Sequence, residues 1–330
     1  MKAGKLDWKD LKGIIDKNRS VERKDVRVRS GIGEDCSVIN FGDKECVVST
    51  DPITGADINS GKLAVHINCN DIASCGIEPV GILVTILLPE AASLEDINRL
   101  MGEISEEARK LNVEILGGHT EVTSAVNKIV ISCTAIGKGD KGKAVSTSGA
   151  KEKDDIVVTK CLCLEGTSII VNDYEDKLSG LLTEEEISEA KDYINQISVV
   201  KEGVLAGEFG VNSMHDITEG GILGALWEIA EASGVGFRVY QDKLPITEVT
   251  EKICSHYLIN PLRLISSGSM LITTPRGEEL VHVLGNKGIR ACVVGEITRG
   301  GYKLICHDEK EEKIDAPGRD ELFILEEKLK

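Results

Sequence analysis

Residues 31–37 read Gly31-Ile32-Gly33-Glu34-Asp35-Cys36-Ser37, a glycine turn with two adjacent carboxylates that precedes a short apolar strand. Glycine lets the backbone take a positive φ or come close to a bulky anion, and carboxylate oxygens are hard ligands that suit Mg²⁺. Acidic residues beside a phosphate require a metal between them. The stretch therefore predicts one wall of a metal–nucleotide site, although short Gly/Asp clusters are also common in ordinary polar hairpin turns.

The composition limits the classes of function. The chain has 330 residues, which is enough for two domains, and its apolar fraction of 41% indicates a folded protein. The formal net charge of −16 argues against binding of nucleic acid or anionic lipid by bulk electrostatics. We find no secretory leader and no long uncharged apolar run, so we expect a cytoplasmic protein with neither nucleic acid nor membrane as partner.

The ten cysteines do not indicate a disulfide framework or a zinc site. Most lie in apolar runs, such as residues 131–134 and 291–294, and are interpreted as small buried hydrophobic residues. Cys161 and Cys163 are the one close pair in the sequence, and no second pair follows at zinc spacing. We therefore interpret this pair as structural.

Two more carboxylates occupy positions that favour a ligand role. Asp51 follows an apolar strand and precedes a proline, although Asp-Pro is also a frequent start of a turn. Asp71 is the only formally charged residue of 63–77, a segment predicted to form a buried helix. An unpaired buried carboxylate is costly, so Asp71 needs a cation, a metal or a set of donors, with Asn70 beside it. Alternatively, Asp71 is a structural residue that caps a neighbouring loop.

A second glycine-rich segment follows the strand predicted at residues 113–116. It reads Gly117-Gly118-His119-Thr120-Glu121 and repeats the chemistry of the first turn. Strand ends followed by glycines are common ligand sites in α/β proteins. The sequence leaves open whether His119 is a base, a phosphate contact or a packing residue.

The second half of the chain carries a third motif, Met214-His215-Asp216-Ile217-Thr218-Glu219-Gly220-Gly221, which opens a helix. Two glycines at a helix N-terminus leave free backbone N–H groups and the positive end of the helix dipole for a phosphate. Gly220 and Gly221 could instead only allow close packing.

We predict an α/β fold with two domains, at residues 1–150 and 151–330. Residues 137–155 are rich in Gly, Lys and Ser and lack periodicity, so we place the domain junction there. Its lysines could indicate phosphate binding, but a flexible hinge or exposed turn is favoured. The charged tail, residues 308–330, is expected to be peripheral.

Five motifs together resemble those of the aminoimidazole ribonucleotide synthetase (PurM-like) superfamily, over about residues 4–325. The nearest branch is similar to the hydrogenase-maturation protein HypE. The order matches as well as the residues. The motifs are residues 31–37, Ser-Thr-Asp-Pro-Ile-Thr (49–54), Asn-Asp-Ile-Ala-Ser-Cys-Gly (70–76), Gly-Gly-His-Thr-Glu (117–121) and His-Asp-Ile-Thr-Glu-Gly-Gly (215–221).

The resemblance implies a fold of the α+β type, a set of cofactors and roles for individual residues. The N-terminal domain would form a β-barrel shared with its copy in a homodimer, and a C-terminal α/β domain would lie alongside. ATP would bind in the cleft, with Mg²⁺ held by acidic residues. The implied metal ligands are Asp35, Asp51, Asp71 and Glu121, with Asp71 and His119 as candidate catalytic residues. The implied nucleotide contacts are Gly31, Gly33, Asn70, Gly117, Gly118, Thr120, Asp216, Glu219, Gly220 and Gly221.

One departure limits the activity that the resemblance implies. HypE proteins end in a Pro-Arg-Ile-Cys-like tail whose cysteine receives a carbamoyl group, whereas the last cysteine here is Cys306. We expect a Mg²⁺- and ATP-dependent HypE-like enzyme that activates an amide- or carboxyl-type oxygen, or transfers phosphate, on a small or protein-borne acceptor. The alternatives are a small-molecule kinase of the thiamine-phosphate-kinase type and a nucleotide-sensing maturation partner without turnover.

Overall fold

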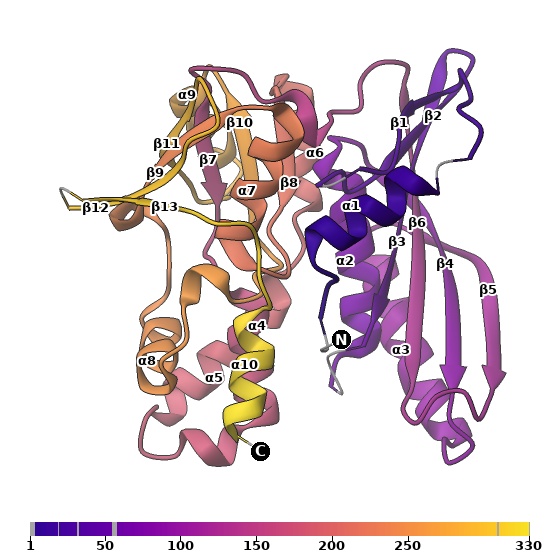
Figure 1. The fold of residues 1–330 in the computed structure, drawn as a ribbon. Coiled ribbons are helices and arrows are strands. Elements are labelled where there is room, and N and C mark those ends of the chain that lie inside the picture. The colour runs from indigo at the N-terminus through magenta and orange to yellow at the C-terminus, as the bar shows by residue number, and fades with distance from the viewer. Residues whose placement is uncertain (1–3, 19, 32, 55–57, 309, 330) are drawn as a thin grey trace.

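The computed structural model describes residues 4–18, 20–31, 33–54, 58–308 and 310–329. These residues form two α/β domains, each built on one mixed β-sheet, and this arrangement agrees with the predicted fold class (Figure 1). None of the helices in these ranges is both long and apolar enough to span a bilayer.

The sheet of the N-terminal domain has the strand order β1-β2-β3-β6-β4-β5. Neighbouring strands are antiparallel, except that β4 and β5 are parallel. The strands are β1 (Val26–Val28), β2 (Ser37–Phe41), β3 (Lys44–Ile53), β4 (Pro79–Leu88), β5 (Glu114–Val122) and β6 (Val130–Asp140).

Helices α2 (Ser60–Ser74) and α3 (Leu94–Lys110) belong to the same domain, and α2 packs on β3 and β6. Most of α2 is buried, as its apolar sequence predicts. Helix α3 begins with a capping box in which Ser93 and Asp96 exchange hydrogen bonds. Helix α1 (Trp8–Lys17) contacts the other domain, where the ring of Trp8 lies 5.0 Å from that of Trp227.

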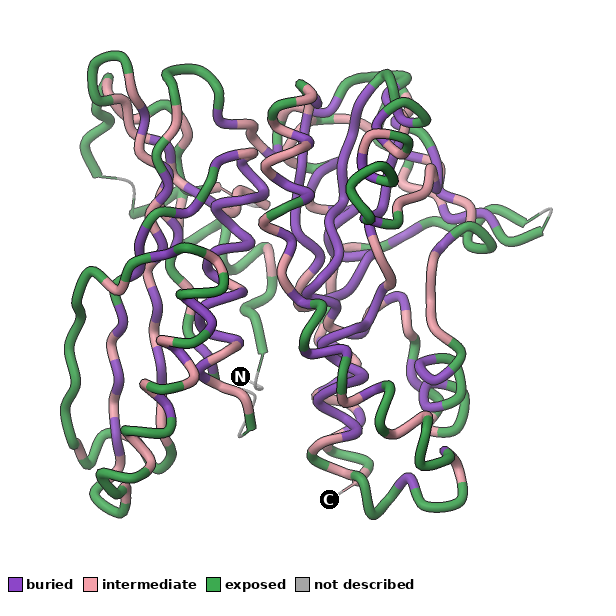
Figure 2. The backbone as a smooth tube through the Cα atoms, turned by 180° about the vertical axis from the view of Figure 1, so that it is seen from behind, coloured by how far each residue is buried: buried purple, intermediate pink, exposed green. Residues whose placement is uncertain are grey.

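The outer edge of this sheet is uncovered in the single chain. Strand β5 has no buried residue and is exposed along nearly its whole length (Figure 2). The exposed fraction is 40% for Leu83 of β4, 49% for Leu116 and 60% for Val122. An edge strand with exposed apolar side chains is a typical pairing surface.

The sheet of the C-terminal domain has the strand order β13-β12-β9-β11-β7-β10-β8, and only β9 and β12 are parallel among its described strands. Its strands are β7 (Asp155–Thr159), β8 (Ser213–Asp216), β9 (Gly236–Tyr240), β10 (Met270–Thr274), β11 (Ala291–Thr298), β12 (Lys303–His307) and β13 (Lys310–Lys313). Its helices are α4 (Leu164–Asp173), α5 (Glu184–Asp192), α6 (Val200–Phe209), α7 (Gly221–Ser233), α8 (Glu248–Tyr257), α9 (Gly277–Gly285) and α10 (Glu321–Leu329).

The segment between the sheets, residues 137–155, contains the expected exposed turn at 141–143, but much of the rest is packed and does not fit a flexible hinge. Its first residues complete strand β6, and its last residue begins β7. Between these strands Ala144 and Thr147 are buried, and Ser146 Oγ donates to Glu34 Oε1 at 2.6 Å. Close packing requires Gly137 and Gly139, where a Cβ atom would lie 2.4 Å from Ile72 and 2.5 Å from Ile77, and the lysines of the turn that follows are exposed.

The tail is also more than a peripheral extension. Leu322 and Leu325 of α10 join the core of the C-terminal domain with exposed fractions of 3% and 0%. The buried carboxylate of Asp320 accepts hydrogen bonds from the backbone N–H groups of Gly220, Leu322 and Ile265. Most charges of this segment lie in β13 and in the loop before α10, and they obscure the apolar residues that the helix contributes to the core.

Glycines let the two domains approach each other through helices α2 and α6. A Cβ atom on Gly203 would lie 2.3 Å from the carbonyl oxygen of Ala73, and one on Gly207 would lie 2.6 Å from the Cα of Gly76. No side chain fits at such distances without a shift of the backbone. Helix α2 is therefore held directly against the second domain.

We expect Gly203→Ala to lower the free energy of unfolding by about 1–3 kcal/mol, the usual cost of overpacking. Gly102→Ala is the control, because an added Cβ there meets no atom within 4 Å and alanine favours the helix. Urea unfolding followed by circular dichroism measures both effects. Equal effects of the two substitutions would contradict the close helix contact.

A buried ion cluster ties α2 to α3. Glu107 lies 2.9 Å from His66 Nε2, 2.9 Å from Lys110 Nζ and 3.7 Å from Lys62 Nζ. The hydrogen bond from His66 lowers the pKa of Glu107 to about 2, with Lys110 and Lys62 acting in the same direction against the effect of burial. The charged form of Glu107 is therefore favoured in the folded protein.

We expect Glu107→Gln to reduce the free energy of unfolding by about 1.5–3 kcal/mol at pH 7, the usual value of hydrogen bonds to charged groups. Because folding lowers this pKa, the contribution is complete above the ordinary value of 4.5 and is lost as the pH falls towards 2. The difference between wild type and variant should therefore shrink below pH 4.5. Glu106→Gln, which removes an exposed partner of the same Lys110, should have little effect in the same urea titrations.

Candidate functional site

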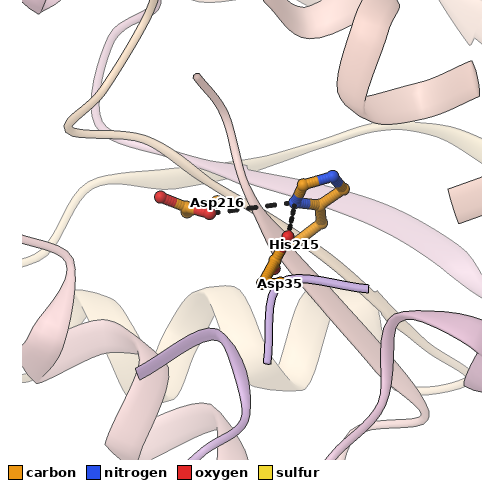
Figure 3. Close-up of side chains that lie close together, drawn as sticks. All are labelled: Asp35, His215 and Asp216. Atoms are coloured by element: carbon orange, nitrogen blue, oxygen red, sulfur yellow. Dashed lines mark ion pairs between the residues drawn. The ribbon is translucent and has the colours of Figure 1, made fainter. Parts of the chain in front are cut away.

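Four carboxylates from both domains meet where β3, α2, the glycine turn and β8 come together. We call Asp35, Asp51, Asp71 and Asp216 the acid cluster. Asp51 hydrogen-bonds with Asp71, and the charge of Asp216 acts on both of them. Asp35 and Asp216 both face the same ring nitrogen of His215, Nδ1 (Figure 3). The structure thus brings together residues that the sequence presents in four separate motifs.

The glycine turn positions Asp35 by its close approach to helix α7. Gly33 has a φ of +78°, and a Cβ atom there would lie 3.0 Å from Cβ of Glu228. Only glycine combines this conformation with this distance. Cys36, which follows Asp35, donates from Sγ to the backbone oxygen of Asp71 at 3.0 Å. The turn and helix α2 are therefore fixed relative to each other.

Gly31 lies at the start of the same turn but away from the carboxylates. It lines a cleft of about 180 Å³ between α1 and the end of α7, beside Trp8, Ile15 and Ala232. The intervening Ile32 is outside the described residues. Gly31 and Gly33, both predicted as nucleotide contacts, therefore lie in different surroundings.

Asp71 is buried and has partners on β3. Ser49 Oγ donates to Asp71 Oδ2 at 2.5 Å, and Asp51 is its second partner. Burial raises the pKa of Asp71 well above its ordinary range, and the charges of Asp216, Asp51 and Asp35 raise it further. A group in this position favours either a proton or a metal ion, as predicted from its isolation in an apolar helix.

His215 and Glu228 also belong to the site, although neither is among the site residues predicted from the sequence. His215 Nδ1 lies 3.0 Å from Asp35 Oδ1 and 3.8 Å from Asp216 Oδ1, while its Nε2 lies 2.8 Å from Glu228 Oε2. Burial alone lowers the pKa of His215, but the three carboxylates raise it well above its ordinary value. His215 is therefore a buried cation between the domains.

The donor set fits a divalent metal. Asp35 Oδ2 and Asp216 Oδ2 are buried and have no hydrogen-bond partner among the described residues. One carboxylate oxygen of Asp35 and one of Asp216 lie within 4.8 Å of each other, and the protonated His215 beside them is not itself a ligand. Burial raises the pKa of Asp35 to about 6. Buried carboxylate oxygens without donors are the ligands that Mg²⁺ takes in proteins, so the acid cluster is a candidate magnesium site.

Asn70 links the two domains through hydrogen bonds. Its Nδ2 donates to the carbonyl oxygen of Ile197 at 2.8 Å, and its Oδ1 accepts from the N–H of Val199 at 2.8 Å. Both polar groups of this buried amide are satisfied. The phosphate contact predicted for Asn70 stays a prediction, while a structural role is observed.

The segment Gly117–Glu121 lies inside edge strand β5, so the expectation that it follows a strand end is wrong. A Cβ atom on Gly118 would lie 1.8 Å from the carbonyl oxygen of Val84, so glycine is needed for pairing with β4. His119, Thr120 and Glu121 are exposed. Strands β4 and β6 separate β5 from β3, which corresponds to roughly 14 Å at normal strand spacing. Within one chain these residues do not reach the acid cluster.

The N-terminus of α7 is occupied by the chain itself. Gly220 N–H donates to Asp320 Oδ2 at 2.7 Å, and burial raises the pKa of Asp320 to about 6. A Cβ on Gly221 would lie 2.7 Å from the carbonyl oxygen of Leu262. Close packing, the alternative considered for both glycines, is therefore observed at Gly221, whereas Gly220 has a φ of +92° and a Cβ there would meet no atom closer than 3.7 Å. Glu219 accepts a hydrogen bond from the backbone of Lys5.

Comparison with known proteins identifies the relatives of this chain. Residues 33–138 match the N-terminal domain, and residues 151–307 the C-terminal domain, of AIR synthase related proteins. A putative hydrogenase expression/formation protein of Methanocaldococcus jannaschii is 30% identical over 316 residues, which are 90% of this chain and 89% of that protein. Carbamoyl dehydratase HypE of Rhizobium leguminosarum bv. viciae is 26% identical over 279 residues, with coverage of 80% and 77%.

A solved structure shows the same fold. The structure of AaThiL complexed with AMPPCP and TMP superposes with a TM-score of 0.75 at 21% identity, covering 96% of this chain and 99% of that one. Both domains therefore have counterparts in one known architecture. With two matched domains and a relative that spans almost the whole sequence, the chain belongs to the AIR synthase-related (PurM-like) family and lies near the hydrogenase-maturation protein HypE.

Proposed function

We propose that this protein binds Mg²⁺ and ATP at the acid cluster and uses the γ-phosphate to activate an amide- or carboxyl-type oxygen, or to phosphorylate an acceptor. The observation that carries the proposal is the convergence of four carboxylates from two domains with two unpartnered oxygens. Mg²⁺ held there would neutralise the phosphate charge, and the carboxylates would fix its position. Positioning and charge neutralisation supply most of the catalysis in phosphoryl transfer.

The relatives support the nucleotide part of this proposal. AaThiL was solved with AMPPCP, a non-hydrolysable analogue of ATP, and shares the whole two-domain fold. HypE relatives are named as carbamoyl dehydratases, and the Methanocaldococcus relative as a hydrogenase expression/formation protein. If the protein acts as HypE relatives do, we expect it to have a maturation protein as a partner and to be located in the cytoplasm. Residues 1–150 would be the ATP-binding and dimerisation domain, and residues 151–330 the second domain.

Cys306 is not the acceptor in this proposal. Cys306 is buried in strand β12, and the segment that follows it is anchored in the core by Asp320 and Leu325. Neither feature presents a thiol to the acid cluster. The TMP complex of AaThiL supports the kinase alternative, and the HypE relatives support activation of an oxygen. Release of ADP, measured with a panel of phosphate acceptors, distinguishes both kinds of enzyme from a nucleotide-binding partner without turnover.

The uncovered sheet edge supports a homodimer whose sites combine two chains. The predicted ligands divide into the acid cluster and the β5 set of Gly117, Gly118, His119, Thr120 and Glu121, which do not meet within one chain. Pairing of the exposed β4–β5 faces would bury Leu83, Leu116 and Val122 and form a shared barrel. Each acid cluster would then receive the β5 set of the partner subunit.

We expect wild-type protein to bind Mg·ATP and Asp71→Asn to weaken that binding about 10- to 100-fold, because a neutral amide cannot balance the metal charge. Asp43→Asn is the control, since Asp43 lies in the exposed β2–β3 turn. Isothermal titration calorimetry measures all three proteins, and EDTA should abolish the signal. Absence of binding by wild type, or equal binding by Asp71→Asn, would contradict the site.

We expect Asp71→Asn and Glu121→Gln to be inactive alone and to recover about a quarter of wild-type ADP production when mixed and allowed to exchange subunits. Half of the random dimers would then contain both chains, and each of these would have one intact site. Mixing Asp71→Asn with Asp216→Asn should restore nothing, because both changes lie in the acid cluster. Recovery in neither mixture, or a monomer by light scattering, would contradict shared sites.

A further inference from the structure

Glu165, in the first turn of α4, is a buried carboxylate that the proposed function does not use. Its exposed fraction is 3%, and its one hydrogen bond from a described residue comes from the backbone N–H of Ser267, 3.3 Å from Oε2. The buried Glu45, in contrast, pairs with Arg27 and accepts two further backbone N–H groups. A buried carboxylate with so few donors is costly and favours a further partner.

The side chain of Ser267 is also incompletely used. Ser267 is 1% exposed, and its Oγ lies near the Glu165 carboxylate without hydrogen-bond geometry to any residue that the structure describes. The neighbouring Ser266, by comparison, accepts the N–H of Cys163 at 2.6 Å through its Oγ. We call Glu165 and Ser267 the α4 pair, because both side chains at this end of α4 can accept or donate one more hydrogen bond.

The loop of residues 264–268 places the α4 pair beside the acid cluster. This loop leads into β10, where Met270 lies opposite Asp216, the last residue of β8. The loop is also held closely against α4, because a Cβ on Gly166 would lie 2.7 Å from the carbonyl oxygen of Ile265. The α4 pair therefore lies next to the strand end that carries Asp216.

The surroundings of Glu165 let it change its protonation state. Burial is the main cause that raises its pKa to about 7, and the groups of Ser267 act in the opposite direction. The charges of Asp320, from the C-terminal segment, and of Asp216, from β8, also raise this pKa. A carboxylate that titrates near neutral pH is suited to accept a proton during a reaction.

We propose that Glu165 is the general base for the acceptor, an inference that rests on the proposed function and adds the group that takes the acceptor's proton. A hydroxyl or amide group of the acceptor would lie between the α4 pair and the γ-phosphate, with Ser267 Oγ as a second hydrogen-bond partner. The acceptor oxygen forms a bond to the γ-phosphorus, and the bond from this phosphorus to the bridging oxygen breaks. ADP leaves with the bonding electron pair, and the acceptor's proton moves to Glu165.

The test measures ADP production from Mg·ATP with water as the acceptor. We expect Glu165→Gln to lower kcat about 100- to 10,000-fold, the usual contribution of general acid–base catalysis, and to change Mg·ATP affinity less than about threefold. Wild-type kcat should fall below about pH 7, where Glu165 is protonated, and the variant should lack this dependence. Ser267→Ala should lower kcat about 5- to 30-fold without a lower melting temperature, because it removes a hydroxyl that has no partner in the folded chain.

Glu185→Gln is the matched control, because Glu185 is an exposed glutamate in the first turn of α5. It should leave kcat and affinity unchanged, with affinities from isothermal titration and folding checked by melting temperature. Wild-type kcat or a wild-type pH profile in Glu165→Gln would overturn the proposal and leave the proposed function intact. Loss of Mg·ATP binding in Glu165→Gln would assign Glu165 to the nucleotide site instead. If wild type produces no ADP, either with water or with the panel of phosphate acceptors, the proposed function itself fails together with this inference.

Discussion

The contact of His215 with Asp35, Asp216 and Glu228 is the interaction on which the arrangement of the site depends. A buried imidazolium and three carboxylates from the glycine turn, β8 and α7 stabilise one another, whereas any one of them alone would be costly to bury. Asp35 comes from the first domain, and the other three groups come from the second. The same charges that hold the domains in register also orient the oxygens that are available to a metal.

Close backbone contacts fix the positions of the segments that carry these charged groups. Gly33 brings the turn against α7, while Gly203 and Gly207 bring α6 against α2. Asn70 of α2 adds two hydrogen bonds to the segment before α6 and so links the two domains. Helix α2 therefore carries Asp71 on a support that both domains hold, which is the kind of rigid placement that a catalytic metal requires.

The sequence predicted the two α/β domains and the residues of the acid cluster, because each carries a local signal. Asp71 stands alone in an apolar helix, and Asp35 follows two glycines. His215 could not be recognised in the same way, since its charge partners lie on three segments that meet only in the folded chain.

The errors have equally specific causes. The apolar run at 113–116 predicts a strand that ends before Gly117 and Gly118, yet β5 continues through both, because an edge strand accommodates glycine where another backbone approaches closely. The tail was expected to be peripheral because its charges outnumber its apolar residues, although two leucines on one face suffice to anchor α10.

The close contact of α2 with α6, made through Gly203 and Gly207, also limits how the two domains can move. Because the two helix backbones touch with no side chains between them, rotation of one domain against the other would require the helices to separate. The segment 4–8, in contrast, is attached near the site by one backbone hydrogen bond and by ring packing. Rotation of the domains would therefore disrupt backbone packing, whereas displacement of this segment would break only these contacts.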